Sequence, residues 1–422
     1  MTTFARLGLN DTLQSNIKSL GYKKPTPIQE KSIGAVLSGT DTYAIAPTGT
    51  GKTAAYLLPI LQELSQVDNS AEQVRPIRAL FLVPTRELAQ QVEESIALYG
   101  KGLNLRTITI FGGVRMQSQM NRFKRGTDIL VATPKRLIDM LKQKAISLSE
   151  IKHFVMDEAD RLVSMGIHDE LKNILAAMPE KVQKVLFSAT DSKALNKFNQ
   201  DHLTRVKLVK GGSIQPALDK IHHTMYRCYR DDKTAHLVNL LTMLNSDKVL
   251  IFADTKRDVN FLTKTLNEQG FVTTGIHNEV SQKRRQERLT GFKQGEFQCL
   301  VATDIVSRGI DITNLYYVIN YDLPVNNNDY IHRVGRTART KVNKLESKKV
   351  LTDKAEKQAM SKSIVNKSFN PYSDPDQQIK VTNSQGHIFS LVCPEQERLV
   401  PLIIKAVGKD IILERTPWKL DK

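Results

Sequence analysis

The chain has 422 residues, 40% of them hydrophobic, so it is long enough for two globular domains with cores of their own. Its 61 Lys and Arg against 44 Asp and Glu give a net charge of +17, which favours a polyanionic partner, chiefly nucleic acid. The three cysteines stand far apart and no run approaches ~18 apolar residues, which argues against a zinc site and a membrane span. The first residues, MTTFARLGLN, contain no apolar signal region.

Short apolar runs alternate with helix-like segments along the first half of the chain. Such alternation is typical of βαβ units around a mostly parallel sheet flanked by helices. The predicted strands of this half are residues 42–46, 78–83, 106–111, 128–132, 153–157 and 184–190.

The alternation pauses at residues 209–220, where glycine, serine and proline indicate a linker. It then restarts, so we predict two α/β domains, residues 1–208 and 221–422, with a ligand cleft between them beyond the carboxyl ends of strands. The predicted strands of the second half are residues 248–253, 271–277, 298–304 and 316–322.

The stretch "APTGTGKT" follows the first predicted strand and opens a helix. Glycines let the backbone N–H groups of such a turn surround phosphate oxygens. In this pattern Lys52 reaches the β- and γ-phosphates and the Thr53 hydroxyl binds Mg²⁺. The strict pattern has glycine where Ala46 stands, and a plain glycine-rich turn is the alternative interpretation.

Three acidic residues, Asp157, Glu158 and Asp160, follow the buried run "HFVM". A carboxylate after a strand is where a P-loop ATPase holds Mg²⁺, which assigns Asp157 to the metal. Glu158 beside it is placed to deprotonate the attacking water. A solvated helix start with favourable acidic residues is the alternative.

Seven motifs occur in order: "GYKKPTPIQ", "APTGTGKT", "PTRELAQQ", "DEAD", "SAT", "TDIVSRGIDI" and "HRVGRTAR". With this set the chain closely resembles the DEAD-box ATP-dependent RNA helicases of superfamily 2, over nearly all of its length. The resemblance implies two RecA-like domains with the ATP site in the cleft between them, and an enzyme that hydrolyses ATP.

The resemblance also implies roles for single residues around ATP. Gln29 resembles the glutamine that reads adenine, and Phe4 the aromatic residue upstream of it, with core packing as the alternative for Phe4. Arg336 and Arg339 resemble the pair that reaches the γ-phosphate from the second domain. The other residues implied in ATP binding are Thr48, Gly49, Thr50, Gly51, Lys52, Thr53, Gly309 and Asp311, and those implied in coupling are Ser188, Thr190, Asp160 and His332.

A second group resembles the family's RNA-backbone contacts, which carry no base code. It comprises Pro84, Thr85, Arg86, Gly113, Thr133, Arg136, Thr255, Gln282, Arg285 and Thr303. One departure stands inside it: the family writes "TPGRL", whereas this chain has "TPKRL" with Lys135. The lysine either strains a backbone that needs glycine or adds a phosphate contact.

A polar, lysine-rich stretch separates "HRVGRTAR" from the strand-like "GHIFSLV", where the family has a short glycine-containing loop. We predict an insertion at about 340–385. Three interpretations stay open: a neutral surface loop, an arm that binds RNA or a partner, and a conceptual-translation artefact.

The function expected from the resemblance is RNA-stimulated ATP hydrolysis coupled to local unwinding of short RNA duplexes or to remodelling of RNA–protein complexes, in ribosome assembly or RNA decay. An ATP-gated RNA clamp with little unwinding is the alternative from the binding class, and a DNA helicase is a third possibility that the motif set disfavours. We expect ATP and Mg²⁺ as cofactors, a monomer without membrane association, and protein cofactors that set substrate choice. The expected location is cytoplasmic, or nuclear or nucleolar in a eukaryote.

Overall fold

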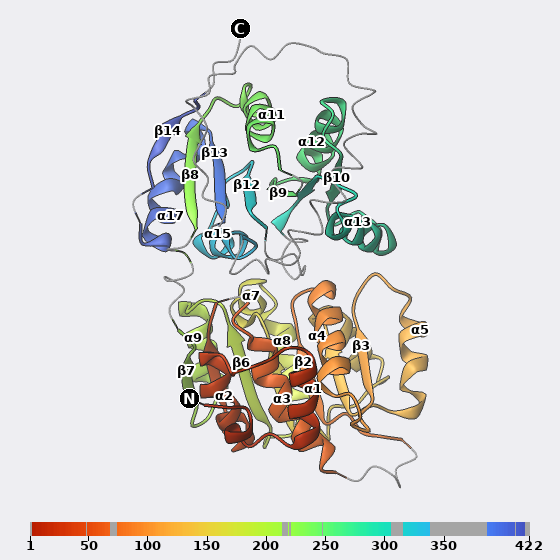
Figure 1. Ribbon diagram of the computed structural model, residues 1–422. Helices are drawn as coiled ribbons and strands as arrows, with labels where there is room; N and C mark the ends of the chain where they lie inside the picture. The colour runs from red at the N-terminus through yellow and green to blue at the C-terminus, as the bar shows by residue number, and fades with distance from the viewer. Residues whose placement is uncertain are drawn as a thin grey trace.

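The computed structural model describes residues 2–47, 49–67, 74–212, 218, 221–246, 248–304, 315–337, 386–409 and 411–417. They form two lobes, each a seven-stranded sheet flanked by helices (Figure 1). The predicted insertion at 340–385 lies outside the described residues, as does most of the predicted linker.

The N-terminal lobe has the strand order β3-β4-β2-β5-β6-β1-β7, and each pair of neighbouring strands is parallel. The last strand begins before the predicted linker and ends at Lys210. The strands are β1 Thr42–Ile45, β2 Ala79–Leu82, β3 Thr107–Ile110, β4 Ile129–Ala132, β5 His153–Met156, β6 Gln183–Ser188 and β7 Lys207–Lys210.

Helices cover both faces of this sheet and so bury its central strands on both sides. Along β2, for example, Phe81 packs into the core on one face while Leu80 and Leu82 pack into the core on the other. One face carries η1 Ala5–Leu7, α1 Asp11–Ser19, α2 Pro27–Leu37, α3 Lys52–Ser65 and α4 Arg86–Tyr99. The rest of the lobe comprises α5 Met116–Met120, η2 Asn121–Arg125, α6 Pro134–Lys142, α7 Ala159–Ser164, α8 His168–Ala176 and α9 Lys193–His202.

The C-terminal lobe repeats the design with the order β10-β11-β9-β12-β13-β8-β14, again with parallel neighbours. Its strands are β8 His222–Arg227, β9 Val249–Phe252, β10 Thr273–Ile276, β11 Cys299–Ala302, β12 Tyr317–Asn320, β13 His387–Val392 and β14 Leu413–Arg415. Its helices are α11 Lys233–Leu244, α12 Lys256–Glu268, α13 Gln282–Gln294, α15 Asn327–Val334, η4 Pro394–Leu399 and α17 Val400–Val407.

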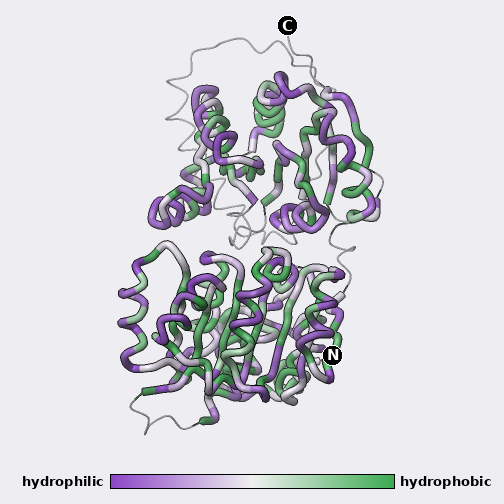
Figure 2. Tube along the Cα trace, turned by 180° about the vertical axis from the view of Figure 1, so that it is seen from behind, coloured by the Kyte–Doolittle hydropathy of each residue, from purple (hydrophilic) through white to green (hydrophobic). Residues whose placement is uncertain are grey.

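The prediction of two α/β lobes with parallel sheets is therefore confirmed. Hydrophobic residues are frequent along the central strands, while hydrophilic and hydrophobic residues alternate along the helices around them (Figure 2). In Figure 1, α7 of the N-terminal lobe and α15 of the C-terminal lobe face each other where the lobes meet. Among the described helices, none combines the length and apolar character needed to cross a bilayer.

Candidate active site at the junction of the two lobes

The phosphate loop connects β1 to α3, as predicted. Gly51 precedes the helix with a φ of +90°, and a side chain there would collide with the Gln29 amide, so only glycine fits. Lys52 begins α3 and is 7% exposed, yet its Nζ has no hydrogen-bond partner among the described residues. A buried ammonium at a helix N-terminus fits a nucleotide phosphate, which would supply the missing acceptors.

The rest of the loop is only partly described. Gly49 also has positive φ, at +73°, and Thr50 donates a hydrogen bond from Oγ1 to Pro47 O over 2.7 Å. Thr53 lies in the first turn of α3, next to Lys52. Thr48 lies outside the described residues.

Gln29 is buried, 1% exposed, at the start of α2. Its Oε1 accepts from Thr26 N over 2.9 Å, and its Nε2 donates to Gly51 O over 3.2 Å. The amide thus ties the helix cap to the phosphate loop while keeping one donor and one lone pair. Phe4 is also buried and packs edge-on against Tyr22, with ring centroids 6.3 Å apart, inside the core of the lobe.

The acidic residues lie at the carboxyl end of β5, next to the phosphate loop, and all are buried. Asp157 accepts hydrogen bonds from Tyr56 Oη and from Glu158 N, each over 2.8 Å. Burial raises the pKa of Asp157 despite the opposing charge of Lys52. Glu158 has a left-handed backbone, with a φ of +49°, which is costly for a residue with a side chain and typical of functional sites.

Cations from both lobes surround Glu158. Desolvation by burial acts to raise its pKa, but the nearby positive charges outweigh that effect and hold the pKa below its usual value. These charges belong to His332, Arg161, Arg336 and Lys52. Since His332 and Arg336 come from the C-terminal lobe, the two halves of the predicted site are brought together.

Arg333 fixes the segment that carries these two residues. It is 1% exposed and forms a bidentate pair with Asp304, at 2.7 Å from Nε and 2.6 Å from Nη2. Its Nη1 donates to Asn320 Oδ1 over 2.9 Å, and its guanidinium stacks over Phe252. This network anchors α15 to the ends of the strands β9, β11 and β12.

The coupling residues are also in contact. Thr190 Oγ1 donates to Asp160 Oδ2 over 2.6 Å, and Ser188 Oγ donates to Thr190 O over 2.6 Å. The "SAT" segment at the end of β6 is therefore tied directly to the acidic segment after β5. Arg339, Gly309 and Asp311, which were predicted to contact the nucleotide, lie outside the described residues.

Three arginines gather on the other side of the junction. Arg86, at the start of α4, lies against Gly113, whose φ of +80° and lack of a side chain leave room for the guanidinium. Burial, followed by the positive charges of Arg285 and Arg136, lowers the pKa of Arg86. Such crowding of like charges suits a polyanion.

One of these arginines also bridges the lobes. Arg285 on α13 forms an ion pair with Glu87 on α4, and both side chains are less than a tenth exposed. Beside it Gln282 Nε2 donates to Gln90 Oε1 over 3.4 Å, again from one lobe to the other. The structure thus gives Arg285 a contact between the lobes, in addition to the RNA contact predicted for it.

The remaining predicted RNA contacts stand at helix starts and strand ends. Thr85 and Thr255 each accept a hydrogen bond at a helix N-terminus, from Leu88 N and Asp258 N. The others are buried: Pro84 after β2, Thr133 before α6, Arg136 in its first turn and Thr303 after β11.

Comparison with known proteins agrees with this geometry. The family model described as DEAD/DEAH box helicase matches residues 26–198, and the one described as Helicase conserved C-terminal domain matches residues 232–341. The chain belongs to the DEAD-box helicase family. Its relatives include proteins named as ATP-dependent RNA helicases.

Two curated relatives illustrate the match. The chain is 39% identical over 355 residues to "Probable ATP-dependent RNA helicase ddx3" of Dictyostelium discoideum, covering 80% of this chain and 49% of the relative. It is 36% identical over 339 residues to "DEAD-box ATP-dependent RNA helicase CshA" of Bacillus cereus, covering 80% and 63%. This DEAD-box chain thus spans about half to two thirds of the length of these relatives.

Solved structures share the fold. The structure "S. cerevisiae Dbp5 bound to RNA and ADP BeF3" superposes with a TM-score of 0.76 at 26% identity, covering 98% of this chain and 95% of that one. For "Mss116p (NTE and C-tail double deletion) bound to ssRNA and AMP-PNP" the TM-score is 0.78 at 24% identity, with 98% and 79% covered.

Sequence reasoning missed Tyr56 in this DEAD-box site. Its hydroxyl is fully buried and bonds the Asp157 carboxylate, and it also lies within hydrogen-bonding reach of the Thr53 side chain. Tyr56 therefore joins the two residues assigned to the metal. Its place one helical turn after Lys52 could have suggested this, since residues four apart share a helix face.

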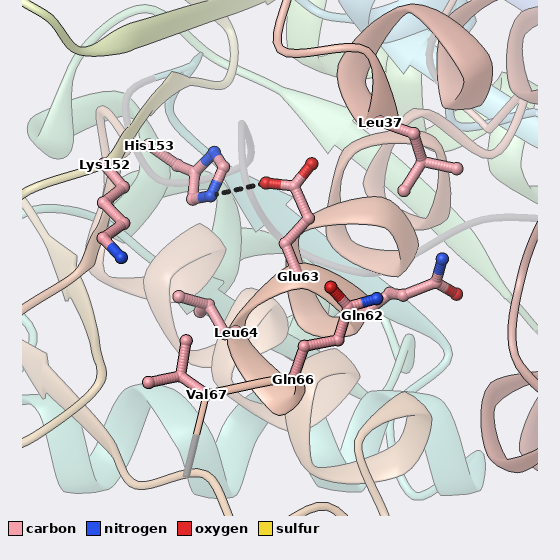
Figure 3. Close-up of a pocket in the computed structure, with 8 residues that line it drawn as sticks. All are labelled: Leu37, Gln62, Glu63, Leu64, Gln66, Val67, Lys152 and His153. Atoms are coloured by element: carbon pink, nitrogen blue, oxygen red, sulfur yellow. Dashed lines mark ion pairs between the residues drawn. The ribbon is translucent and has the colours of Figure 1, made fainter. Parts of the chain in front are cut away.

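A separate pocket of about 460 Å³ lies at the far end of α3 (Figure 3). Within it His153 Nε2 lies 2.9 Å from Glu63 Oε2. None of the predicted site residues lines it, so the pocket is distinct from the nucleotide site. Its lining is Leu37, Gln62, Glu63, Leu64, Gln66, Val67, Lys152 and His153.

Proposed function

We propose that this chain is an RNA-stimulated ATPase that uses ATP hydrolysis to separate short RNA duplexes or to remodel RNA–protein complexes. The observation that carries the proposal is the environment of Glu158, where Lys52 of one lobe and Arg336 of the other both approach the same carboxylate. An active site divided in this way works only when the lobes are together, so a ligand that binds both lobes can control hydrolysis.

The chemistry follows from the residues of the two half-sites. Lys52 would bind the β- and γ-phosphates, and Glu158, ionised because its pKa is lowered, would accept the proton of the attacking water. Arg336 would stabilise the charge that develops on the γ-phosphate. Thr53 and Asp157 would hold Mg²⁺, partly through water, and the ion would neutralise phosphate charge.

RNA is the proposed stimulating ligand. Arg86, Arg136 and Arg285 concentrate positive charge from both lobes beside the helix starts that carry Thr85 and Thr133. Donors of this kind bind phosphates without reading bases, so sequence-independent binding is expected. The names of the relatives, ATP-dependent RNA helicases, support RNA over DNA.

Coupling to strand separation is proposed over simple clamping because Thr190 and Asp160 are in direct contact. This bond gives hydrolysis at the acidic segment a physical connection to the segment after β6. We further propose that the chain acts as a monomer away from membranes, in the cytoplasm or in the nucleus or nucleolus of a eukaryote. Protein cofactors would direct it to its RNA, in ribosome assembly or RNA decay.

The test is Glu158→Gln, which keeps the shape of the side chain and removes the base. We expect ATP and RNA binding to persist while RNA-stimulated hydrolysis falls about 10²–10⁴-fold. Glu150→Gln, at an exposed carboxylate of the same lobe, is the matched control and should turn over normally.

Near-normal turnover of Glu158→Gln would remove Glu158 as the base. A strand-displacement assay on a short RNA duplex then separates unwinding from clamping, and a comparison of RNA with DNA as activator separates an RNA from a DNA helicase. A wild-type protein whose ATPase rate does not respond to RNA would contradict the proposed function.

A further inference from the structure

Lys135 occupies a position where the family pattern "TPGRL" has glycine. It lies in the first turn of α6, and it is absent from the residues with positive φ, so its backbone needs no glycine. The side chain is exposed, unlike those of its neighbours Pro134 and Arg136. The lysine therefore adds a solvent-facing charge without straining the helix.

The start of α6 is an unfavourable place for a positively charged side chain such as Lys135 unless an anion is also present. The first turn of α6 contains no acidic residue, and Thr133 makes no side-chain capping bond there. The partial positive charge of a helix N-terminus repels Lys135 and Arg136, whereas an anion at the same place would be attracted by both. Among the ion pairs of the described residues, none involves Lys135.

Arg136 supplies an independent sign of an anion site. Its side chain is 8% exposed and is held by Gln119 Oε1 and Val114 O, each accepting over 2.9 Å. Its Nε is buried without a hydrogen-bond partner among the described residues. The guanidinium is also close enough to Arg86 to affect its ionisation, so the start of α6 and the start of α4 share one positive region.

We propose that Lys135 binds a backbone phosphate of RNA, as one more contact than a glycine at this position can make. The inference rests on the proposed RNA-binding function, and it names a residue of this chain that would strengthen RNA binding. A lysine is suited to the role because its ammonium is a compact charge on a flexible stem and can follow a phosphate without fixed geometry. The contact carries no base information, so it should act equally on all sequences.

The experiment measures how the affinity for a short single-stranded oligouridylate falls with salt, in the presence of a non-hydrolysable ATP analogue. Each phosphate contact to a single strand contributes about 0.7 to the slope of log K against log salt. Lys135→Ala should make this slope shallower by about 0.7. Over a fourfold rise in salt concentration, the variant should therefore lose about 2–3-fold less of its RNA affinity than the wild type loses. Lys135→Gly should match it, and Lys135→Arg should keep the wild-type slope.

Lys142→Ala is the matched control, because Lys142 is an exposed lysine at the opposite end of the same helix. It should leave the slope unchanged. Thermal unfolding is the second readout: removing a cation from a helix start should leave the melting temperature of Lys135→Ala equal or higher, whereas a structural role would lower it.

Equal slopes for wild type, Lys135→Ala and Lys142→Ala would overturn the inference while leaving RNA binding intact. Equal reductions in both alanine variants would also overturn it, since the effect would then be general charge. If the wild-type protein binds no oligouridylate, the proposed function fails and this inference fails with it.

Discussion

The lobes meet in two places that differ in how their charges are balanced. On the ATP side, the positive charges of Lys52, Arg161 and Arg336 act on the carboxylate of Glu158, and Lys52 Nζ is buried without a hydrogen-bond partner among the described residues. On the RNA side, Glu87 and Arg285 form a direct ion pair across the junction. The cations around Glu158 are thus arranged for additional negative charge, whereas the Glu87–Arg285 contact is complete without a ligand, although the crowded Arg86 and Arg136 lie near it.

The difference indicates separate tasks. A buried pair that needs no ligand can hold the lobes in register, because breaking it would leave an uncompensated charge. An excess of cations, in contrast, stabilises a polyanion and the charge that develops during its hydrolysis. We infer that the Glu87–Arg285 pair aligns the lobes beside the proposed RNA contacts and that the ATP side performs the chemistry, and the following experiments test this division.

The largest effect is expected from Arg336→Ala on the ATP side. RNA-stimulated turnover should fall about 10³–10⁵-fold, because charge stabilisation by an arginine of the opposite lobe is lost. Binding of ATP should change little, since the phosphate loop lies on the other lobe. Single-turnover hydrolysis and nucleotide titration measure the two quantities.

The control is Arg230→Ala, whose side chain is 84% exposed on the same lobe and should leave turnover unchanged. If Arg336→Ala hydrolyses ATP within a few-fold of the wild-type rate, the C-terminal lobe does not contribute the charge that the division assigns to it.

An intermediate effect is expected on the RNA side. Glu87→Ala and Arg285→Ala should each raise the RNA concentration needed for half-maximal ATPase stimulation. The double variant should lose less than the sum of the two, with a coupling energy of about 0.5–3 kcal/mol. A titration of ATPase rate against oligouridylate gives all the values.

The exposed pair Lys264–Glu268 on α12 offers a matched cycle, with its atoms 3.8 Å apart and both side chains mostly exposed. Its coupling should be close to zero because solvent screens it. Equal coupling in the two cycles would contradict an aligning role for Glu87 and Arg285.

The smallest effect concerns the support of α15. Burial, then the negative charge of Asp322, raises the pKa of Asp254 to about 6, although Arg333 Nη2 lies 3.7 Å away. Because this folded-state pKa is above the unfolded value of about 3.9, the group stabilises the fold only at low pH and loses that contribution as pH rises towards about 6.

Asp254→Asn should therefore raise the apparent melting temperature at pH 7.5, by roughly 2 °C since the side chain is 41% exposed and partly screened. At pH 4.5, between the unfolded and folded pKa values, most of this difference in melting temperature should disappear, because folded Asp254 is then largely protonated. Scanning calorimetry at both pH values checks this, and a lower melting temperature of the variant at pH 7.5 would show that the pair with Arg333 dominates.

Much of the fold could be predicted because buried parallel strands appear as continuous apolar runs, such as "ALFL" in β2 and "VLIF" in β9. The strands β7, β8 and β14 were not predicted. In β7, an edge strand of the first sheet, only Val209 is buried, and β14 is a three-residue edge strand of the second sheet, so neither has the apolar pattern of a central strand. Polar side chains dominate in β8, so it too lacks the apolar pattern of a central strand. One of them, His223, forms a hydrogen bond with the Tyr330 hydroxyl over 2.9 Å.

The local half-sites were equally accessible to sequence reasoning. Lys52 and Thr53 are chain neighbours, as are Asp157 and Glu158, and each pair follows a strand whose end faces the same edge of one sheet. Spacing along the chain therefore identified them. Glu87 was not singled out, because nothing in "PTRELAQQ" shows that its carboxylate meets an arginine nearly two hundred residues later.

The sequence by itself determined the two α/β domains, the phosphate loop and the acidic segment, since strand burial and short motifs are properties of neighbouring residues. Only the tertiary structure decided that Tyr56 orients Asp157, that Arg285 pairs with Glu87, and that Lys135 stands in a helix without strain. These features depend on distances between segments far apart in the chain and on backbone angles. Tertiary packing sets both, so a short sequence motif does not predict them.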